Sequence, residues 1–300
     1  MGKDTTFSPF TLNLRHKLVT FDRPAVMGIL NVTPDSFYGE SRCGDVAAIR
    51  RRALQLVDEG ADLIDVGCVS TRPGARLLDP DDEAVRLEAA VTAVRSVLPD
   101  VPISVDTCYS LPARRAVAAG ADMINDISGG LFDGSLFDTV AELQVPYVLS
   151  HNRTTPDRMH LYTHYDDLIG EVVRFLSDRL HQLYALGVND VWIDPGFGFS
   201  KDEDDNYRLL SALDEMTSLF REPLLVGVSR KSMIYKPLNV TPEEALHGTT
   251  VLHTIALMQG TRILRVHDPL PARQAATLVQ RLYKASHTAP SNDTSPLHPL

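Results

Sequence analysis

Three polar residues of the sequence occupy positions where a buried side chain needs a partner. Asp106, Asn125 and Asp194 lie inside or directly against short apolar runs. An unpaired carboxylate or amide is costly to bury there, so we expect each to meet a hydrogen-bonding partner or a ligand. Carboxylates accept from paired N–H groups, as they do from the edge of a base. These residues therefore favour a site for a nitrogen heterocycle.

Cationic residues, or residues that can become cationic, occupy similar positions. The chain has 29 Lys and Arg against 39 Asp and Glu, a formal net charge of −10, so cations gathered at one place would form a local basic patch. Such a patch suits phosphate or pyrophosphate, because Arg makes forked contacts and Lys supplies a point charge. Ordinary surface pairing with Asp and Glu fits Arg50–Arg52 better. The candidates are Arg72, Arg230, Lys231, Arg265 and His267.

Two kinds of metal site are conceivable from the residue types. Asn31 and Asp35 offer oxygen ligands, and Mg²⁺ commonly uses one or two protein oxygens together with phosphate and water. A zinc site formed by His151, His160 and His164 is the alternative. The spacing of His160 and His164 falls in a stretch that contains Pro and Thr and not on a clear helix, so solvated loop histidines are the better interpretation.

The elements that must position these residues alternate between short apolar runs and longer stretches with helical spacing. Alternation of this kind predicts parallel strands joined by helices, and eight such units are typical of a (β/α)₈ barrel. A doubly wound open sheet is the alternative. The expected strands are Ala25–Leu30, Asp62–Gly67, Val101–Asp106, Asp122–Ile127, Val145–Ser150, Asp190–Asp194, Pro223–Ser229 and Arg262–His267. The expected helices are Asp45–Gly60, Asp81–Val97, Leu111–Gly120, Asp166–Leu186, Pro242–Gly260 and Pro269–Lys284.

No break in composition divides the chain, so we expect a single barrel domain over residues 25–284. Residues 1–24 would form a short N-terminal extension, and residues 285–300, rich in Ser, Pro, Thr and His, a disordered, flexible tail. Catalytic residues of barrels come from the C-terminal ends of the strands. Strand ends are often polar for structural reasons alone, but here polar residues close all eight runs at that end. The pattern therefore indicates a site.

The acidic balance argues against nucleic acid and acidic membranes as partners. No apolar run approaches the roughly 20 residues that span a bilayer, and residues 1–24 lack the apolar core of a signal peptide. Cys43, Cys68 and Cys108 show no C-x-x-C spacing, which favours a reducing compartment and packing roles. We therefore expect a cytoplasmic protein.

A series of motifs at these strand ends resembles the dihydropteroate synthase family of folate biosynthesis. The first is Met27-Gly28-Ile29-Leu30-Asn31-Val32-Thr33-Pro34-Asp35-Ser36-Phe37, and the second is Ser70-Thr71-Arg72-Pro73-Gly74-Ala75. The others follow in the order of the family: Ser104–Thr107, Asn125–Ile127, Asp194–Phe199, Ser229–Lys231 and Arg265–Asp268. Cys68-Val69, Tyr38-Gly39-Glu40 and Ser150-His151-Asn152 depart from the pattern of the family.

The resemblance implies a (β/α)₈ barrel that condenses 6-hydroxymethyl-7,8-dihydropterin pyrophosphate with 4-aminobenzoate and requires Mg²⁺. It also implies a homodimer and inhibition by sulfonamides, which mimic 4-aminobenzoate. A catalytically silent pterin-binding homologue and a pterin-dependent methyltransferase domain are the alternatives.

The resemblance also assigns roles to residues. It places the pterin at Asp106, Asn125, Asp194, Gly227 and Lys231, and the pyrophosphate at Asn31, Thr71, Arg265 and His267, with Asn31 as the metal ligand. The 4-aminobenzoate would be bordered by Phe37, Thr71, Arg72, Pro73, Phe199 and Ser232. The catalytic residues would be Asp106, Asp35, Lys231 and Arg265.

Overall fold

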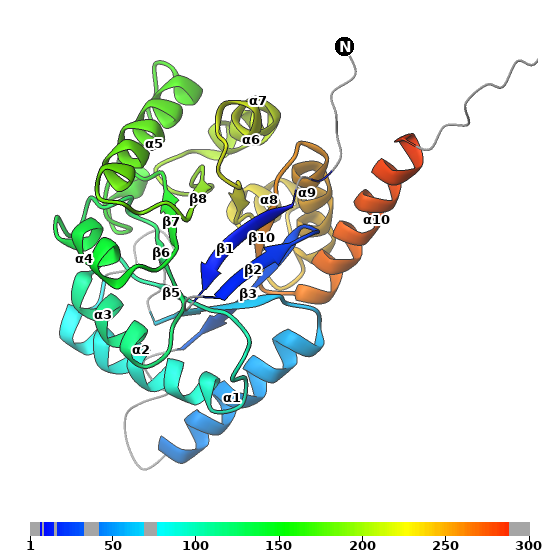
Figure 1. The fold of residues 1–300 in the computed structure, drawn as a ribbon. Helices are drawn as coiled ribbons and strands as arrows, with labels where there is room; N and C mark the ends of the chain where they lie inside the picture. The colour runs from blue at the N-terminus through cyan, green and yellow to red at the C-terminus, as the bar shows by residue number, and fades with distance from the viewer. Residues whose placement is uncertain (1–6, 8, 15–16, 33–41, 69–76, 288–300) are drawn as a thin grey trace, which may run out of the picture.

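A computed structural model of the chain describes residues 7, 9–14, 17–32, 42–68 and 77–287. Its centre is a sheet of eight parallel strands with helices on the outside (Figure 1). Each strand falls within or overlaps one of the eight expected runs. The strands are β3 (Ala25–Asn31), β4 (Leu63–Gly67), β5 (Ile103–Asp106), β6 (Met123–Asp126), β7 (Tyr147–Ser150), β8 (Val191–Asp194), β9 (Leu225–Val226) and β10 (Ile263–Val266).

The order of the strands distinguishes a barrel from an open sheet. Neighbours run β8-β7-β6-β5-β4-β3-β10-β9. The two ends of this series meet through a parallel bridge between Ile193 and Leu224, and the amide of Ile193 donates to the carbonyl of Pro223 at 3.0 Å. The sheet is therefore a nearly closed barrel, which confirms the predicted (β/α)₈ fold and excludes the doubly wound alternative.

Helices cover the outside of the barrel, because each strand is apolar on both faces and its outer face must be buried. The six expected helices are present, and four short ones, α4, α6, α7 and α8, were not anticipated. Helix α10 extends three residues beyond the expected domain end at residue 284. The α-helices are α1 (Arg42–Asp58), α2 (Pro80–Arg95), α3 (Ser110–Ala118), α4 (Leu136–Leu143), α5 (Leu168–Ala185), α6 (Glu203–Ser211), α7 (Leu213–Leu219), α8 (Ser232–Leu238), α9 (Leu246–Met258) and α10 (Pro269–His287).

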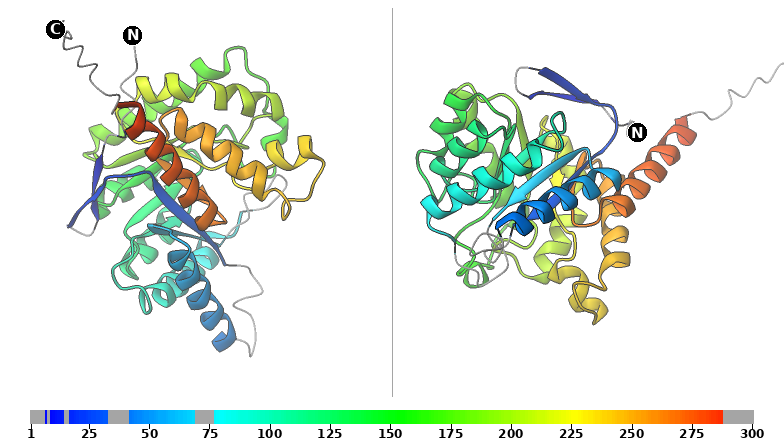
Figure 2. Two further views of the ribbon diagram at one scale, coloured as in Figure 1. Left: turned by 90° about the vertical axis from the view of Figure 1, so that its right-hand side faces the viewer. Right: turned by 90° about the horizontal axis from the view of Figure 1, so that it is seen from below.

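The N-terminal extension contains a structure that the sequence patterns did not predict. Strands β1 (Phe10–Leu14) and β2 (Lys17–Phe21) form an antiparallel hairpin that lies across the N-terminal end of the barrel (Figures 1 and 2). Phe10 and Phe21 stack at 4.9 Å between ring centroids, and both make T-shaped contacts with Trp192 in β8. The hairpin thus closes the apolar bottom of the barrel.

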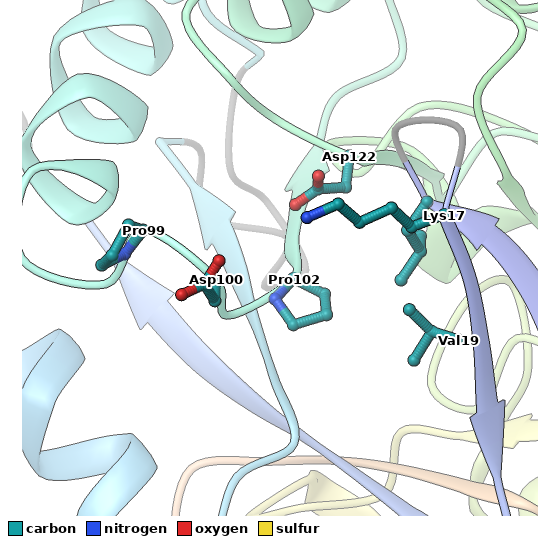
Figure 3. Close-up of a pocket in the computed structure, with 7 residues that line it drawn as sticks. Lys17, Val19, Pro99, Asp100, Pro102 and Asp122 are labelled. Carbon is teal, nitrogen blue, oxygen red and sulfur yellow. The ribbon is translucent and has the colours of Figure 1, made fainter.

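A cavity of about 310 Å³ lies at this same end (Figure 3). Hairpin residues line one side of it, and residues that precede β5 and β6 line the other. Its carboxylate Asp122 already accepts from Arg95 at 2.6 Å and from the amide of Ile103 at 2.7 Å, so it has a structural role. The cavity is therefore remote from the polar strand ends. Its lining residues are Leu14, Lys17, Val19, Pro99, Asp100, Pro102 and Asp122.

Candidate active site

Polar side chains from four strands meet at the C-terminal end of the barrel. Asp65 comes from β4, Asp106 from β5, Asn125 from β6 and Arg265 from β10. The strand register places Asp106 beside both Gly67 and Asn125. The structure therefore brings together three residues singled out from the sequence and adds a fourth, Asp65.

Arg265 is the centre of this cluster. Its Nε donates to Asp65 Oδ2 at 2.6 Å and its Nη2 donates to Asp106 Oδ2 at 2.7 Å. Asn125 Nδ2 also donates to Asp65 Oδ2, at 3.0 Å. Burial raises the pKa of Asp106 above its usual value, while the neighbouring guanidinium of Arg265 opposes that rise. The cluster therefore holds one cation between two carboxylates, and its net charge is negative when both are ionised.

Asp65 was not singled out from the sequence, although it is completely buried. Its Oδ1 has no hydrogen-bond partner among the described residues. The signal that would have found it is the one that marked Asp106, because Asp65 interrupts the apolar run Leu63–Gly67. A carboxylate in that position needs partners, and Arg265 and Asn125 supply them.

Asp194 and Lys231 occupy the other side of the strand ends. Asp194 Oδ1 accepts from the amide of Gly196 at 2.8 Å, and burial raises the pKa of Asp194. Lys231 precedes α8, and its Nζ donates to the carbonyl of Phe197 at 2.5 Å. The ammonium also lies 4.5 Å from the ring centroid of Phe199. Burial lowers the pKa of Lys231 to about 8, so it remains mostly charged at neutral pH.

Two members of the expected basic patch differ from expectation. Burial, followed by the charge of Arg265, lowers the pKa of His267 to about 4, so its imidazole is neutral at pH 7. Its Nδ1 lies 3.0 Å from Ser229 Oγ. Arg230 makes a forked ion pair with Asp268, with both distances 2.8 Å. Among the described residues, the patch is therefore reduced to Lys231 and Arg265.

The remaining predicted residues fall into two groups. Asn31 ends β3 with an exposed side chain, Phe199 is buried, Ser232 begins α8, and Gly227 lies beside Arg265. A Cβ on Gly227 would stand 3.9 Å from Arg265 Cβ, which is an ordinary contact. The others, Asp35, Phe37, Thr71, Arg72 and Pro73, lie outside the described residues.

The structure does not assemble the alternative zinc site. His151 is buried against Lys201, whereas His160 is exposed and His164 is an exposed partner of Asp166 at 3.4 Å. Within the described ranges, no group of three or more His, Cys, Asp or Glu could hold a metal ion. The expectation of solvated loop histidines is confirmed for His160 and His164 and is wrong for His151.

Comparisons with known proteins agree with this geometry. Residues 27–267 match the family described as pterin binding enzyme. The chain is 40% identical over 265 residues to the dihydropteroate synthase of Synechocystis sp., covering 87% of this chain and 91% of that one. It is 39% identical over 264 residues to the dihydropteroate synthase of Escherichia coli, covering 87% and 93%.

Solved structures of dihydropteroate synthases from other organisms resemble the fold. The dihydropteroate synthase of Yersinia pestis in a sulfonamide complex superposes with a TM-score of 0.84 at 37% identity, covering 92% of this chain and 100% of that one. That of Xanthomonas albilineans with 4-aminobenzoic acid superposes with a TM-score of 0.82 at 38% identity, covering 94% and 100%.

The chain belongs to the dihydropteroate synthase family.

Within this family of pterin-binding transferases, the match extends from β3 to the residue after β10. It therefore includes all the strand ends described above, whereas the hairpin β1–β2 precedes it. The relatives bearing the name dihydropteroate synthase also decide against the methyltransferase alternative. Within the described residues, no helix is long and apolar enough to cross a bilayer.

Proposed function

We propose that this chain condenses 6-hydroxymethyl-7,8-dihydropterin pyrophosphate with 4-aminobenzoate, yielding 7,8-dihydropteroate and pyrophosphate in folate biosynthesis. The observation that carries the proposal is the buried cluster of Asp65, Asp106, Asn125 and Arg265 in a chain of this family. Solved structures of the dihydropteroate synthase of Xanthomonas albilineans, which has a similar fold, contain 4-aminobenzoic acid in one case and 7,8-dihydropteroate in another. The pterin-binding domain would be residues 25–284.

The pterin would bind against Asp106, Asn125, Asp194 and Lys231. A pterin presents an amino group and a ring N–H as donors and a ring carbonyl as acceptor. Carboxylates complement the donors, and the ammonium of Lys231 complements the carbonyl. Gly227 would leave room for the ring plane, because its missing side chain would project beside Arg265.

The pyrophosphate would bind at Asn31, Thr71, Arg265 and His267. Arg265 is already held by two carboxylates, so it would approach the phosphates from a fixed position. His267 would contribute a hydrogen bond and not a positive charge, because its imidazole is neutral at pH 7. Arg265 thus supplies the positive charge among the described members of this set.

The reaction would proceed through charge and position. The bond between the pterin methylene and the pyrophosphate oxygen breaks, and its electrons leave with pyrophosphate. Carboxylates such as Asp106 favour the cationic methylene that remains. The neutral amine of 4-aminobenzoate then forms the new C–N bond and loses a proton. We assign the catalytic roles to Asp106, Asp35, Lys231 and Arg265.

Magnesium fits the donor chemistry at the end of β3. The side chain of Asn31 is exposed there and carries an amide oxygen, and Mg²⁺ binds through few protein oxygens when phosphates supply the others. When bound, the ion would neutralise charge on the leaving pyrophosphate. We therefore propose Asn31 as a metal ligand. Titrating pyrophosphate in Mg²⁺ and in EDTA tests this, and equal affinities would remove the metal from the proposal.

The 4-aminobenzoate would lie near Phe199, whose ring contacts the ammonium of Lys231, and near Ser232, which follows Lys231 in the chain. Phe37, Thr71, Arg72 and Pro73 would complete its site. Sulfonamides would compete for the same place. We further propose a cytoplasmic enzyme.

A homodimer would use the outer face of α9 and α10, which lie side by side (Figures 1 and 2). Five large apolar side chains on these helices are each more than half exposed: Val251, Met258, Leu270, Leu278 and Leu282. Apolar residues grouped on a surface mark an interaction site. Light scattering on Leu278→Glu tests this face: a monomeric variant beside a dimeric parent supports it, whereas a monomeric parent contradicts it.

The activity assay mixes purified protein, the pterin pyrophosphate, 4-aminobenzoate and Mg²⁺ and follows dihydropteroate by chromatography. Product that depends on all components supports the proposed reaction. Folded protein that binds the pterin but forms no product would establish the silent homologue instead.

A further inference from the structure

The loop that follows β8 has an unusual backbone. Gly196, Gly198 and Ser200 all have positive φ angles, of 78°, 77° and 49°. A residue other than glycine is rarely left-handed, and such a conformation persists where surrounding contacts determine it. A Cβ on Gly196 would stand 2.0 Å from the carbonyl oxygen of His151, so this turn admits only glycine.

A buried lysine holds the loop from beneath. Lys201 is only 7% exposed, and its Nζ lies 3.0 Å from the carbonyl oxygen of Gly196 and 3.1 Å from that of Phe199. The third contact is His151 Nδ1 at 2.9 Å. Burial lowers the pKa of His151 well below its usual value, so the imidazole is neutral and its Nδ1 can accept. Burial lowers the pKa of Lys201 to about 7, and in the ammonium form each of its three N–H groups has an acceptor.

Further contacts restrain the loop from its sides. The amide of Gly198 donates to Asn206 Oδ1 at 2.6 Å. The hydroxyl of Ser200 donates to Asn152 Oδ1 at 3.0 Å, and the hydroxyl of Tyr165 donates to the carbonyl of Ser200 at 2.8 Å. Lys201 differs from these side chains because its ammonium joins both ends of the turn, at Gly196 and at Phe199.

The restrained loop, residues 196–200, packs against the side chain of Lys231. The carbonyl of Phe197, between the two carbonyls bound by Lys201, accepts from Lys231 Nζ. The ring of Phe199 lies under the same ammonium. A Cβ on Gly198 would come within 3.2 Å of Lys231 Cδ, so the loop backbone also packs against the stem of Lys231.

We infer that Lys201 is a positioning residue for the pterin site, which fixes the turn of residues 196–199 so that Lys231 and Phe199 face the ligand. The inference rests on the proposed function for the ligand, but its structural half is independent of it. Lys201 itself lies beneath the loop and acts through Lys231.

The experiment uses Lys201→Met in the full chain, with Lys236→Met as the matched control because Lys236 is exposed on α8. Hydrogen exchange reports on the loop: the peptide covering residues 195–206 should lose at least tenfold protection in Lys201→Met and none in Lys236→Met. Calorimetry with 6-hydroxymethylpterin should show about tenfold weaker binding, and the KM for the pterin pyrophosphate should rise more than kcat falls.

A double-mutant cycle separates positioning from general damage. If Lys201 acts through Lys231, then Lys201→Met should weaken 6-hydroxymethylpterin binding less than twofold once Lys231→Met is present. Should Lys201→Met fail to fold, the pair His151→Asn and His151→Leu replaces it. Asparagine can offer an acceptor to the ammonium, so His151→Asn should keep the wild-type affinity for 6-hydroxymethylpterin. Leucine cannot, so His151→Leu should bind it more weakly.

Unchanged exchange and unchanged affinity in Lys201→Met would overturn the inference, as would equal losses with and without Lys231. A wild-type protein that binds the pterin without forming product would contradict the proposed reaction, while the exchange and binding results would still decide the role of Lys201.

Discussion

Replacing Asp65 by asparagine tests how the charged cluster at the strand ends is held together. Asp65 is completely buried and accepts from Arg265 at 2.6 Å and from Asn125 at 3.0 Å. A hydrogen bond to a charged group contributes about 1.5–3 kcal/mol, and removing one partner of a buried ion pair costs about 3–5 kcal/mol. Asp106 remains as a partner of Arg265, so we expect a loss in the lower part of these ranges, about 2–3 kcal/mol.

The same substitution should lower activity, because Arg265 would be held by one carboxylate instead of two. Dihydropteroate formation should then fall ten- to a hundredfold in kcat/KM, where each factor of ten corresponds to about 1.4 kcal/mol. Urea unfolding followed by the fluorescence of Trp192, the only tryptophan of the chain, measures the stability change. Asp190→Asn is the matched control, since the side chain of Asp190 lies at the other end of the barrel, where it accepts a hydrogen bond from the amide of Asn13 at 3.0 Å.

The reasoning would be refuted if the free energy of unfolding of Asp65→Asn lay within 0.5 kcal/mol of the wild-type value, a margin usual for surface substitutions, and its kcat/KM were unchanged. A stability loss with unchanged kcat/KM would restrict Asp65 to folding alone. A similar loss of activity in Asp190→Asn would show that the assay responds to any weakening of the barrel.

Three further predictions concern separate parts of the chain. Asp194→Ala should weaken pterin binding at least tenfold in calorimetry, because a buried bond to a charged group is lost; unchanged affinity would remove Asp194 from the site. His253 is buried, and burial lowers its pKa from 6.5 to about 4, so its stabilising contribution is complete above pH 6.5 and is lost as the pH falls towards 4. As the pH falls from 7.5 to 4, the free energy of unfolding of His253→Leu, measured with urea, should therefore rise by about 3 kcal/mol relative to that of wild type. The same difference between the two proteins at both pH values would contradict this. Phe10→Ala should cost about 3–5 kcal/mol and red-shift the emission of Trp192, which it contacts edge-on, without changing pterin affinity; a stability loss below 1 kcal/mol would show that the hairpin does not seal the barrel.

The sequence alone determined the barrel and predicted three of the residues that meet at its C-terminal end. Eight apolar runs alternate with helical stretches, and a parallel sheet covered on both faces requires that pattern. Asp106, Asn125 and Asp194 were recognisable because a polar group in or against an apolar run is costly unless it is paired, and Arg265 was recognisable as a cation at a strand end. The resemblance of the strand-end motifs then indicated the family, and the comparisons confirmed it.

Tertiary structure decided what depends on contacts between distant segments. The pairing of Asp65 with Arg265 joins residues 200 positions apart, and the burial that makes His267 neutral is likewise a property of its surroundings. The hairpin β1–β2 escaped prediction because a short two-stranded hairpin is marginal alone and is stabilised by packing on the barrel. Local patterns specify which residues are apolar or charged, but the charge state and partners of a buried group follow from the neighbours that folding brings to it.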